Sequence, residues 1–169
     1  MNPNDAIRLF VKTLRNLEQW MDKAVAHAQA KSFEVDVLAQ ARLAPDQYPF
    51  VRQVQLACDQ AKYAAAYLGG KPAPSHPDTE QTFAELRRRI QKCLGFVETV
   101  QPADFAGSEE RKVSPPWLNG KWLRGDDYLV HVAIPNFFFH ATTAYAILRH
   151  NGVVLGKMDF IGSLPTREG

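Results

Sequence analysis

The stretch Pro135–Gly152, with the sequence PNFFFHATTAYAILRHNG, contains the strongest single clue to the fold of this chain. Three consecutive aromatic residues lead into His140, and good helix-forming apolar residues follow. The stretch ends at Asn151-Gly152, a pair that favours a left-handed cap at the C-terminus of a helix. It therefore predicts the last part of a long helix with a histidine on one of its faces.

This helix is expected to begin at Asp126 or Asp127 and to run to about Arg149. Pro135 lies inside it. A proline in a helix lacks the backbone donor and crowds the carbonyl four residues earlier, here that of His131, so we expect a kink at this point.

Three further segments have apolar residues at the alternating spacing of three and four that is typical of an amphipathic helix. They cover residues 2 to about 30, about 49–68 and about 78–97. The second carries a narrow seam of mostly small residues, which allows a neighbouring helix to approach closely; the seam consists of Val51, Val54, Cys58, Ala61, Ala65 and Leu68. Asp78, with Gln81 three residues on, is expected to cap the third helix.

The connections between these helices are irregular. A short helical piece is expected near Val35–Ala41, and Asn119-Gly120 indicates a two-residue hairpin turn within a small β excursion between Pro102 and Gly125. The tail VVLGKMDFIGSL is apolar but short, and we expect it to lie extended against the helices. The pattern predicts an all-α fold in one domain, residues 1–169.

The composition excludes several classes of protein. Hydrophobic residues make up 46% of the 169 residues and charged residues 22%, which is typical of a folded globular chain. The net charge is only +2, so a nucleic-acid partner is not indicated. No signal peptide and no apolar run of about 20 residues is visible, which predicts a cytoplasmic protein without a membrane span.

Two sets of side chains receive structural rather than functional interpretations. Cys58 and Cys93 lie on apolar helix faces and are expected to be buried free thiols. The basic run of Arg87, Arg88 and Arg89, with Lys92 nearby, is interpreted as a solvated helix face, since consecutive residues of a helix point in different directions.

The candidate functional site is a polar cluster at helical spacing. Asn136 and His140 are four residues apart on the last helix, and Gln55 and Asp59 are four apart on the second. If these helices are neighbours, the four side chains can meet. A carboxylate beside an imidazole fixes its tautomer and raises its basicity, so Asp59 and His140 are the candidate catalytic pair, with Gln55 and Asn136 as candidate ligand-binding residues.

Tyr63 and Tyr145 could add hydroxyl groups to this site and are included as candidate ligand-binding residues. A structural alternative stays open. A single histidine in an aromatic-rich helix is often a core residue that forms one hydrogen bond with a neighbour, and His140 could be of that kind.

Two long stretches carry a family likeness: PDQYPFVRQVQLACDQAKYAAAYLGG at residues 45–70 and PNFFFHATTAYAILRHNGVVLGKMDFIG at residues 135–162. With the four helices and the hairpin material before the last one, they resemble an uncharacterised bacterial and fungal family in the DinB/YfiT-like superfamily of putative metalloenzymes. The resemblance covers nearly the whole chain. It implies an up-down-down-up four-helix bundle with a long connection between the second and third helices, commonly dimeric.

The resemblance also implies a possible metal site. Better known members of the superfamily bind nickel or zinc through three histidines, one on the second helix and an H-x-x-x-H pair on the fourth. Here Asn136 and His140 correspond to that pair, and the second-helix position falls near Gln55 or Asp59. Amide oxygens are poor ligands for these ions, so no tightly held metal is expected.

Two functional hypotheses follow. In the first, the protein is a degenerate metal-dependent or thiol-dependent transferase with a polar pocket around His140. In the second, it is a non-catalytic, dimeric small-molecule-binding or structural module. A homodimer is expected from the resemblance, with Trp117 and Trp122 of the hairpin as possible interface residues.

Overall fold

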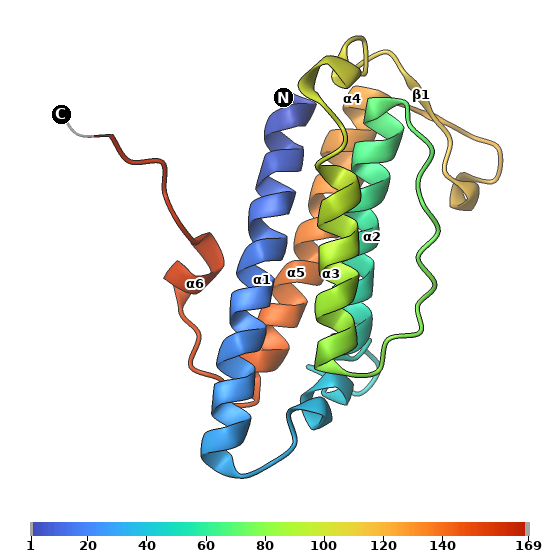
Figure 1. Cartoon of the computed structure of the whole chain (residues 1–169). Helices are drawn as coiled ribbons and strands as arrows, with labels where there is room; N and C mark the ends of the chain where they lie inside the picture. Colours follow the sequence, from blue (N-terminus) through green and yellow to red (C-terminus); the bar gives the residue numbers. More distant parts are fainter. Residues whose placement is uncertain (1, 168–169) are drawn as a thin grey trace.

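The computed structural model describes residues 2–167, which form a bundle of four long helices (Figure 1). These are α1 (Pro3–Lys31), α2 (Phe50–Gly69), α3 (Phe83–Val97) and α5 (Ile134–His150). The helices α2 and α3 run parallel to each other, and α1 and α5 run in the opposite direction (Figure 1). The predicted up-down-down-up helical bundle is confirmed, and the connection from α2 to α3 spans the length of the bundle.

Helix α1 begins and ends where its residues favour it. The Asn2 side chain accepts a hydrogen bond from the Asn4 amide at 2.9 Å, and Pro3 occupies the first turn. The helix ends at Ser32, which adopts a left-handed conformation with φ of 57°. Its core stripe is fully buried: Phe10, Leu14, Leu17, Trp20 and Met21. A short 3-10 helix, η1 (Val35–Gln40), then leads to α2.

Helix α3 begins five residues later than expected. Thr82, not Asp78, is its N-cap, and the Thr82 hydroxyl and the Glu85 carboxylate form the two reciprocal bonds of a capping box. The pair Asp78 and Gln81 was the wrong choice because Asp78 lies in the connection and forms ion pairs there.

The predicted break near Pro135 takes the form of a π-helical turn. Helix α4 (Gly125–Tyr128) continues into the π-helical segment η4 (Leu129–Ala133) and then into α5, with Pro135 in the first turn of α5. A π-helical turn shifts the hydrogen-bond ladder by one residue, which accommodates the missing proline donor without ending the helix.

The hairpin before α4 is wider than predicted. After η2 (Pro102–Phe105), strand β1 (Lys112–Val113) pairs antiparallel with β2 (Leu123–Arg124). Asn119 and Gly120 have positive φ angles of 50° and 85°, as a turn requires. However, they lie within a long loop that also contains η3 (Pro116–Leu118), so the prediction of a two-residue hairpin turn was wrong.

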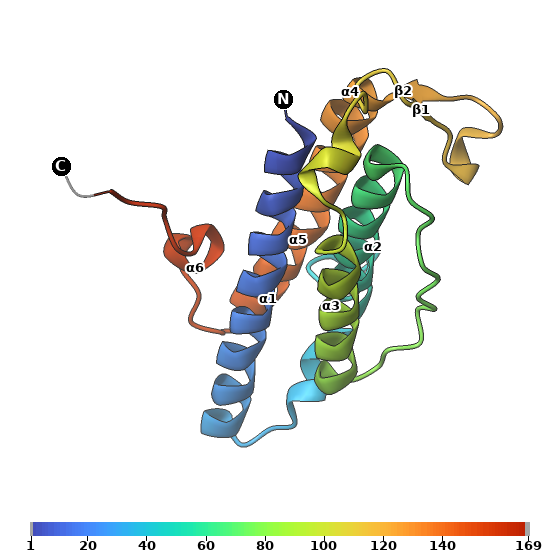
Figure 2. The same ribbon diagram turned by 45° about the horizontal axis from the view of Figure 1, so that its top comes forward.

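The C-terminal segment forms a short helix, α6 (Lys157–Ile161), where an extended tail was expected. It lies beside α1 (Figures 1 and 2). The Trp20 indole donates to the Asp159 carbonyl at 2.9 Å, and the Asn16 amide donates to the Phe160 carbonyl at 2.9 Å. These donors satisfy carbonyl groups of the helical turn, which an extended strand would present differently.

The core lies between the four long helices, with α2 at its centre. Helix α2 packs mainly against α5 and α3, and its small residues allow the close approach. This confirms that the second and last long helices are neighbours. Among the described residues, no helix is long and apolar enough to cross a membrane.

Gly125→Ala, at the start of α4, is expected to destabilise the protein by about 3 kcal/mol, because the new Cβ would overlap the backbone of Ser108. A Cβ on Gly125 would lie 1.8 Å from the Ser108 carbonyl oxygen. The matched control is Gly95→Ala on α3, where a Cβ meets open space, and a gain of about 0.5–1 kcal/mol is expected. Urea denaturation followed by circular dichroism measures both; equal midpoints for the two variants would contradict the packing at Gly125.

Candidate functional site

His140 points from α5 toward α2, where it meets Gln53. The His140 Nδ1 and Gln53 Oε1 atoms are 2.8 Å apart, and His140 is only 8% exposed. Gln53 is buried as well. The imidazole is thus a nearly enclosed group with one hydrogen-bond partner, as the structural alternative for His140 expected.

The orientation of this pair is fixed by the backbone. The Gln53 amide nitrogen donates to the Tyr48 carbonyl at 3.0 Å, so its oxygen must face His140. Since that oxygen only accepts, His140 carries its proton on Nδ1 when neutral, and Nε2 is left with a free lone pair. Tyr48, Gln53 and His140 therefore form a relay that fixes the imidazole tautomer.

The environment holds His140 in its neutral form. Burial, followed by the nearby positive charge of Arg52, lowers the pKa of His140 to about 4. A general base is most effective with a pKa near the working pH. At neutral pH, His140 is therefore an uncharged hydrogen-bonding group and a weak base.

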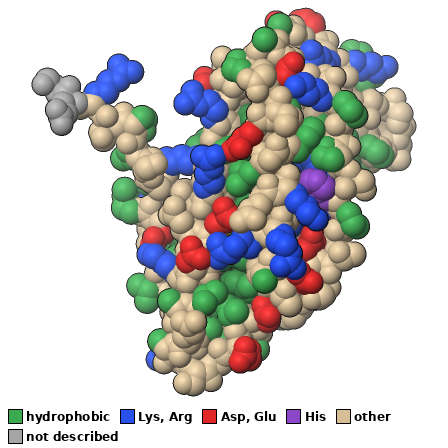
Figure 3. Space-filling view, viewed as in Figure 1, with side chains coloured by type: hydrophobic (Ala, Val, Ile, Leu, Met, Phe, Trp, Pro, Cys, Tyr) green, Lys and Arg blue, Asp and Glu red, His purple; other side chains and the backbone are tan. Residues whose placement is uncertain are grey.

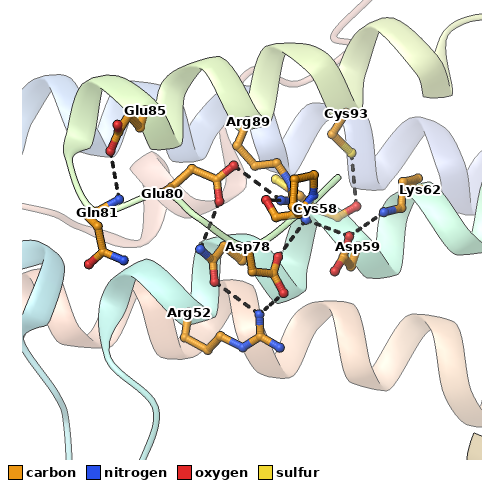
Figure 4. A network of polar contacts seen from close by, with 12 residues as sticks. Arg52, Cys58, Asp59, Lys62, Asp78, Glu80, Gln81, Glu85, Arg89 and Cys93 are labelled. Carbon is orange, nitrogen blue, oxygen red and sulfur yellow. Dashed lines mark hydrogen bonds and ion pairs between the residues drawn. The ribbon is translucent and has the colours of Figure 1, made fainter. Parts of the chain in front are cut away.

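Asp59 does not form the predicted pair with His140. Its carboxylate lies 2.7 Å from Lys62 Nζ and 2.8 Å from Nη2 of Arg89 (Figure 4). Gln53 and Asp59 are six residues apart, which places them about 120° apart around α2. Gln53 faces α5, whereas Asp59 faces α3. The assignment of Asp59 as partner of His140 is therefore corrected to Gln53.

Gln55 also faces away from His140. Its amide nitrogen donates to Glu80 at 3.0 Å, and its amide oxygen accepts from Arg52 at 3.2 Å. Gln53 was not among the residues predicted for the site. A signal was present: it lies one turn before Ala57 on a face of small, fully buried residues.

Arg89 is the centre of a second polar group, the Arg89 cluster, which joins α2, α3 and the α2–α3 connector (Figure 4). Its guanidinium lies 3.1 Å from Asp78 and 3.4 Å from Glu80, besides its contact with Asp59. It also donates to the Pro77 carbonyl at 3.2 Å. Arg52 forms a further ion pair with Asp78.

The interpretation of the basic run as a solvated face was wrong for Arg89, which is 1% exposed. Arg87 pairs with Asp22 of α1 and Arg88 is exposed, so the three arginines point in three directions. Burial alone would lower the pKa of Arg89, but the attraction of Asp59 and the other acidic groups outweighs it and raises that pKa. The guanidinium stays charged inside the cluster.

The two cysteines are buried, as predicted, and lie side by side between α2 and α3. The Cys93 thiol donates to the Cys58 carbonyl at 3.1 Å. The hydrogen bond with Cys93, together with burial, raises the pKa of the Cys58 thiol well above its ordinary value. The Cys58 thiol is therefore not an activated nucleophile, because the thiolate is the reactive form.

The remaining predicted site residues are dispersed. Tyr63 stacks on Tyr67 and lies under the Lys62 ammonium, 4.5 Å from its ring centre. Tyr145 packs edge-on against Trp20 and Phe160, between α1 and α6. Neither tyrosine joins His140. Asn136 lies one turn before His140 on the same face of α5 and is half-buried.

The residues around His140 do not fit a nickel or zinc ion. Among residues 2–167, no group of three or more His, Cys, Asp or Glu side chains lies close enough together to hold a metal. Gln53, which meets His140, and Asn136, one turn before it on α5, carry amide groups, which are poor ligands for these ions. Gln53, rather than Gln55 or Asp59, is the α2 side chain that meets His140.

Arg89→Leu is expected to destabilise the protein by about 3–5 kcal/mol, because it leaves three carboxylates without their shared cation. The matched control, Arg88→Leu, removes an exposed arginine next to it in the sequence and should change stability by less than about 0.5 kcal/mol. Thermal and urea unfolding report both; near-equal stabilities would show that the Arg89 cluster does not hold the connector.

The folded protein should lose stability as the pH falls from about 6.5 to about 4, partly through His140. Between these pH values His140 binds a proton in the unfolded chain but not in the folded chain. The free energy of unfolding therefore falls by about 3 kcal/mol over the whole range. His140→Asn keeps a donor toward Gln53 but does not titrate, so its stability should fall less steeply with pH. The control His131→Asn, at an exposed histidine, should follow the wild type, and urea midpoints across this range test the difference.

Comparison with known proteins agrees with this architecture. Residues 4–161 match the family described as Domain of unknown function (DUF1993). A crystal structure of a DinB family member protein from Shewanella denitrificans is 47% identical, with 96% of this chain and 93% of that chain covered and a TM-score of 0.92. No curated protein matches. The chain therefore belongs to the DUF1993 family, an uncharacterised family of DinB-like helical bundles.

Proposed function

We propose that this protein is a DinB-like small-molecule-binding bundle in which His140 is a neutral hydrogen-bond acceptor. The observation that carries the proposal is the relay from the Tyr48 carbonyl through Gln53 to His140 Nδ1. A relay of this kind orients an imidazole and leaves Nε2 free to accept a hydrogen bond from a ligand.

The free nitrogen of His140 supports a site at the edge of the α2–α5 contact. Nε2 has no partner among residues 2–167, yet it is not one of their fully enclosed unpaired polar atoms. Phe139, directly before His140, is 54% exposed, and Tyr48 is 58% exposed. Exposed aromatic rings near a convergent polar group are typical of ligand sites. The ligand class is a small, flat molecule that carries an O–H or N–H donor.

The alternative of a metal-dependent or thiol-dependent transferase receives less support. The amide groups of Gln53 and Asn136 make weak ligands for nickel or zinc beside a single histidine. The low pKa of His140 makes it a poor general base, and the raised pKa of the buried Cys58 thiol keeps it from being activated. Binding without catalysis is the function that these properties favour.

A homodimer is part of the proposal. Trp117 and Trp122 of the hairpin are 58% and 51% exposed, and the hairpin extends from the side of the bundle (Figure 1). Tryptophan is enriched at protein interfaces and depleted at free surfaces. These two side chains support a role for the hairpin in contact with a second copy.

A fragment screen by thermal shift at pH 7 tests the proposed site. Flat fragments with an O–H or N–H donor should raise the melting temperature of the wild type, because a ligand selective for the folded state stabilises it. The same fragments should fail with His140→Phe, which removes the acceptor, and should still act on His131→Asn. Nickel and zinc salts, tested alongside, should give no shift that depends on His140.

Two results would contradict the proposal. One is a set of binding fragments that act equally on the wild type and on His140→Phe. The other is a nickel or zinc shift in the wild type that His140→Phe abolishes, which would favour the metal-dependent hypothesis. The melting temperature of each variant without ligand shows whether it is folded.

A further inference from the structure

A groove lies between the first half of α1, the end of α3 and the segment that follows α6. The volume of this groove is about 750 Å³, which is within the usual range of volumes of small-molecule sites. Residues Ser163–Pro165 line the groove on the side opposite α1. The C-terminal segment stands away from the body of the molecule, and Lys and Arg side chains gather beside it (Figure 3).

The side of the groove formed by α1 is basic. Arg8, Lys12 and Arg15 line it at intervals of one turn. Arg15 pairs with Glu98 at 2.5 Å, whereas Arg8 and Lys12 have no ion-pair or hydrogen-bond partner within residues 2–167. With Asp5 and Glu98, the lining holds three cations and two carboxylates. The net charge of the groove lining is therefore that of one cation.

The floor of the groove is apolar. Ile7 of α1 and Val97 and Val100 at the end of α3 belong to this floor but are at most 7% exposed. The apolar surface available to a ligand comes mainly from Leu9 of α1, which is 46% exposed, and from Leu164 of the C-terminal segment, which is 55% exposed.

The C-terminal segment is held in place at its base. Gly162 has a φ of 69°, and a Cβ at this position would lie 2.5 Å from the Asn16 side chain. The chain therefore turns in close contact with α1 before it enters residues 163–165. This contact fixes the point at which the segment leaves α1.

We propose that this groove binds a single-chain fatty carboxylate. Arg8 and Lys12 would bind the carboxylate head, and the acyl chain would lie along Leu9 and Leu164. The surplus of one cation matches a monoanionic head better than a dianionic phosphate. Two unpaired cations are too few for a nucleic-acid backbone, which is bound through many phosphate contacts.

Isothermal titration calorimetry with dodecanoate below its critical micelle concentration tests this site on the full chain. Dodecanoate should bind the wild type with one site per chain. The double variant Arg8→Gln/Lys12→Gln should bind about tenfold more weakly, as expected for the loss of two partly exposed charge contacts. The control Arg88→Gln removes an exposed arginine of α3 that does not line the groove and should bind as the wild type does.

Matched ligands separate the contributions of head and chain. Dodecanol and dodecyltrimethylammonium have the same chain length and should bind more weakly than dodecanoate, and Leu164→Ser should weaken dodecanoate binding. Equal binding of the three amphiphiles, or equal binding by wild type and the double variant, would overturn the proposal. Tighter binding of dodecyl phosphate than of dodecanoate would overturn the choice of head group.

The proposals for the His140 site and for the groove can be tested independently of each other. His140→Asn should bind dodecanoate as the wild type does, because His140 does not line the groove. Loss of dodecanoate binding in His140→Asn would place the amphiphile at the His140 site and overturn the assignment to the groove.

Discussion

The contact on which the rest of the bundle depends is the one between the Arg89 guanidinium and the carboxylates of Asp59, Asp78 and Glu80. Helices α2 and α3 are parallel, so the chain between them must return along the length of the bundle without regular structure of its own. Ordering such a segment on folding costs conformational entropy, and burial of its few apolar residues does not offset this cost. A charged group at 1% exposure requires nearly all of its donors to be bound, and the connector supplies Asp78, Glu80 and the Pro77 carbonyl.

This arrangement separates the polar residues of α2 into two groups with different physical roles. Gln55, Asp59 and Lys62 face the Arg89 cluster, where opposite charges neutralise one another and leave little capacity for a ligand. Gln53 faces α5 and meets a single uncharged imidazole. The first group sets how helices and connector are joined. The second leaves one acceptor atom without a partner, which is why the proposed ligand site is assigned to His140 rather than to the more highly charged cluster.

Much of the fold could be predicted because its signals are local. The apolar spacing of α1, the small residues of α2 and the break at Pro135 each depend on neighbours within a few residues. The exact start of α3 was missed because Asp78 and Thr82 are both good N-caps, and the choice between them depends on whether Arg52 and Arg89 lie close to Asp78. The α6 turn was missed because its stability comes from Trp20 and Asn16, more than 130 residues earlier in the chain.

By itself, the sequence determined where the four long helices lie and that each has an apolar face to bury. These properties follow from periodicity and composition, which act along the chain. Only the tertiary structure decided which residue of α2 His140 meets, that Arg89 is buried while Arg88 is not, and that a basic groove forms beside α1. Each of these depends on the rotation of one helix about its axis relative to another. A rotation of about 100° exchanges adjacent residues at a contact, and only the packing of the whole core sets that angle.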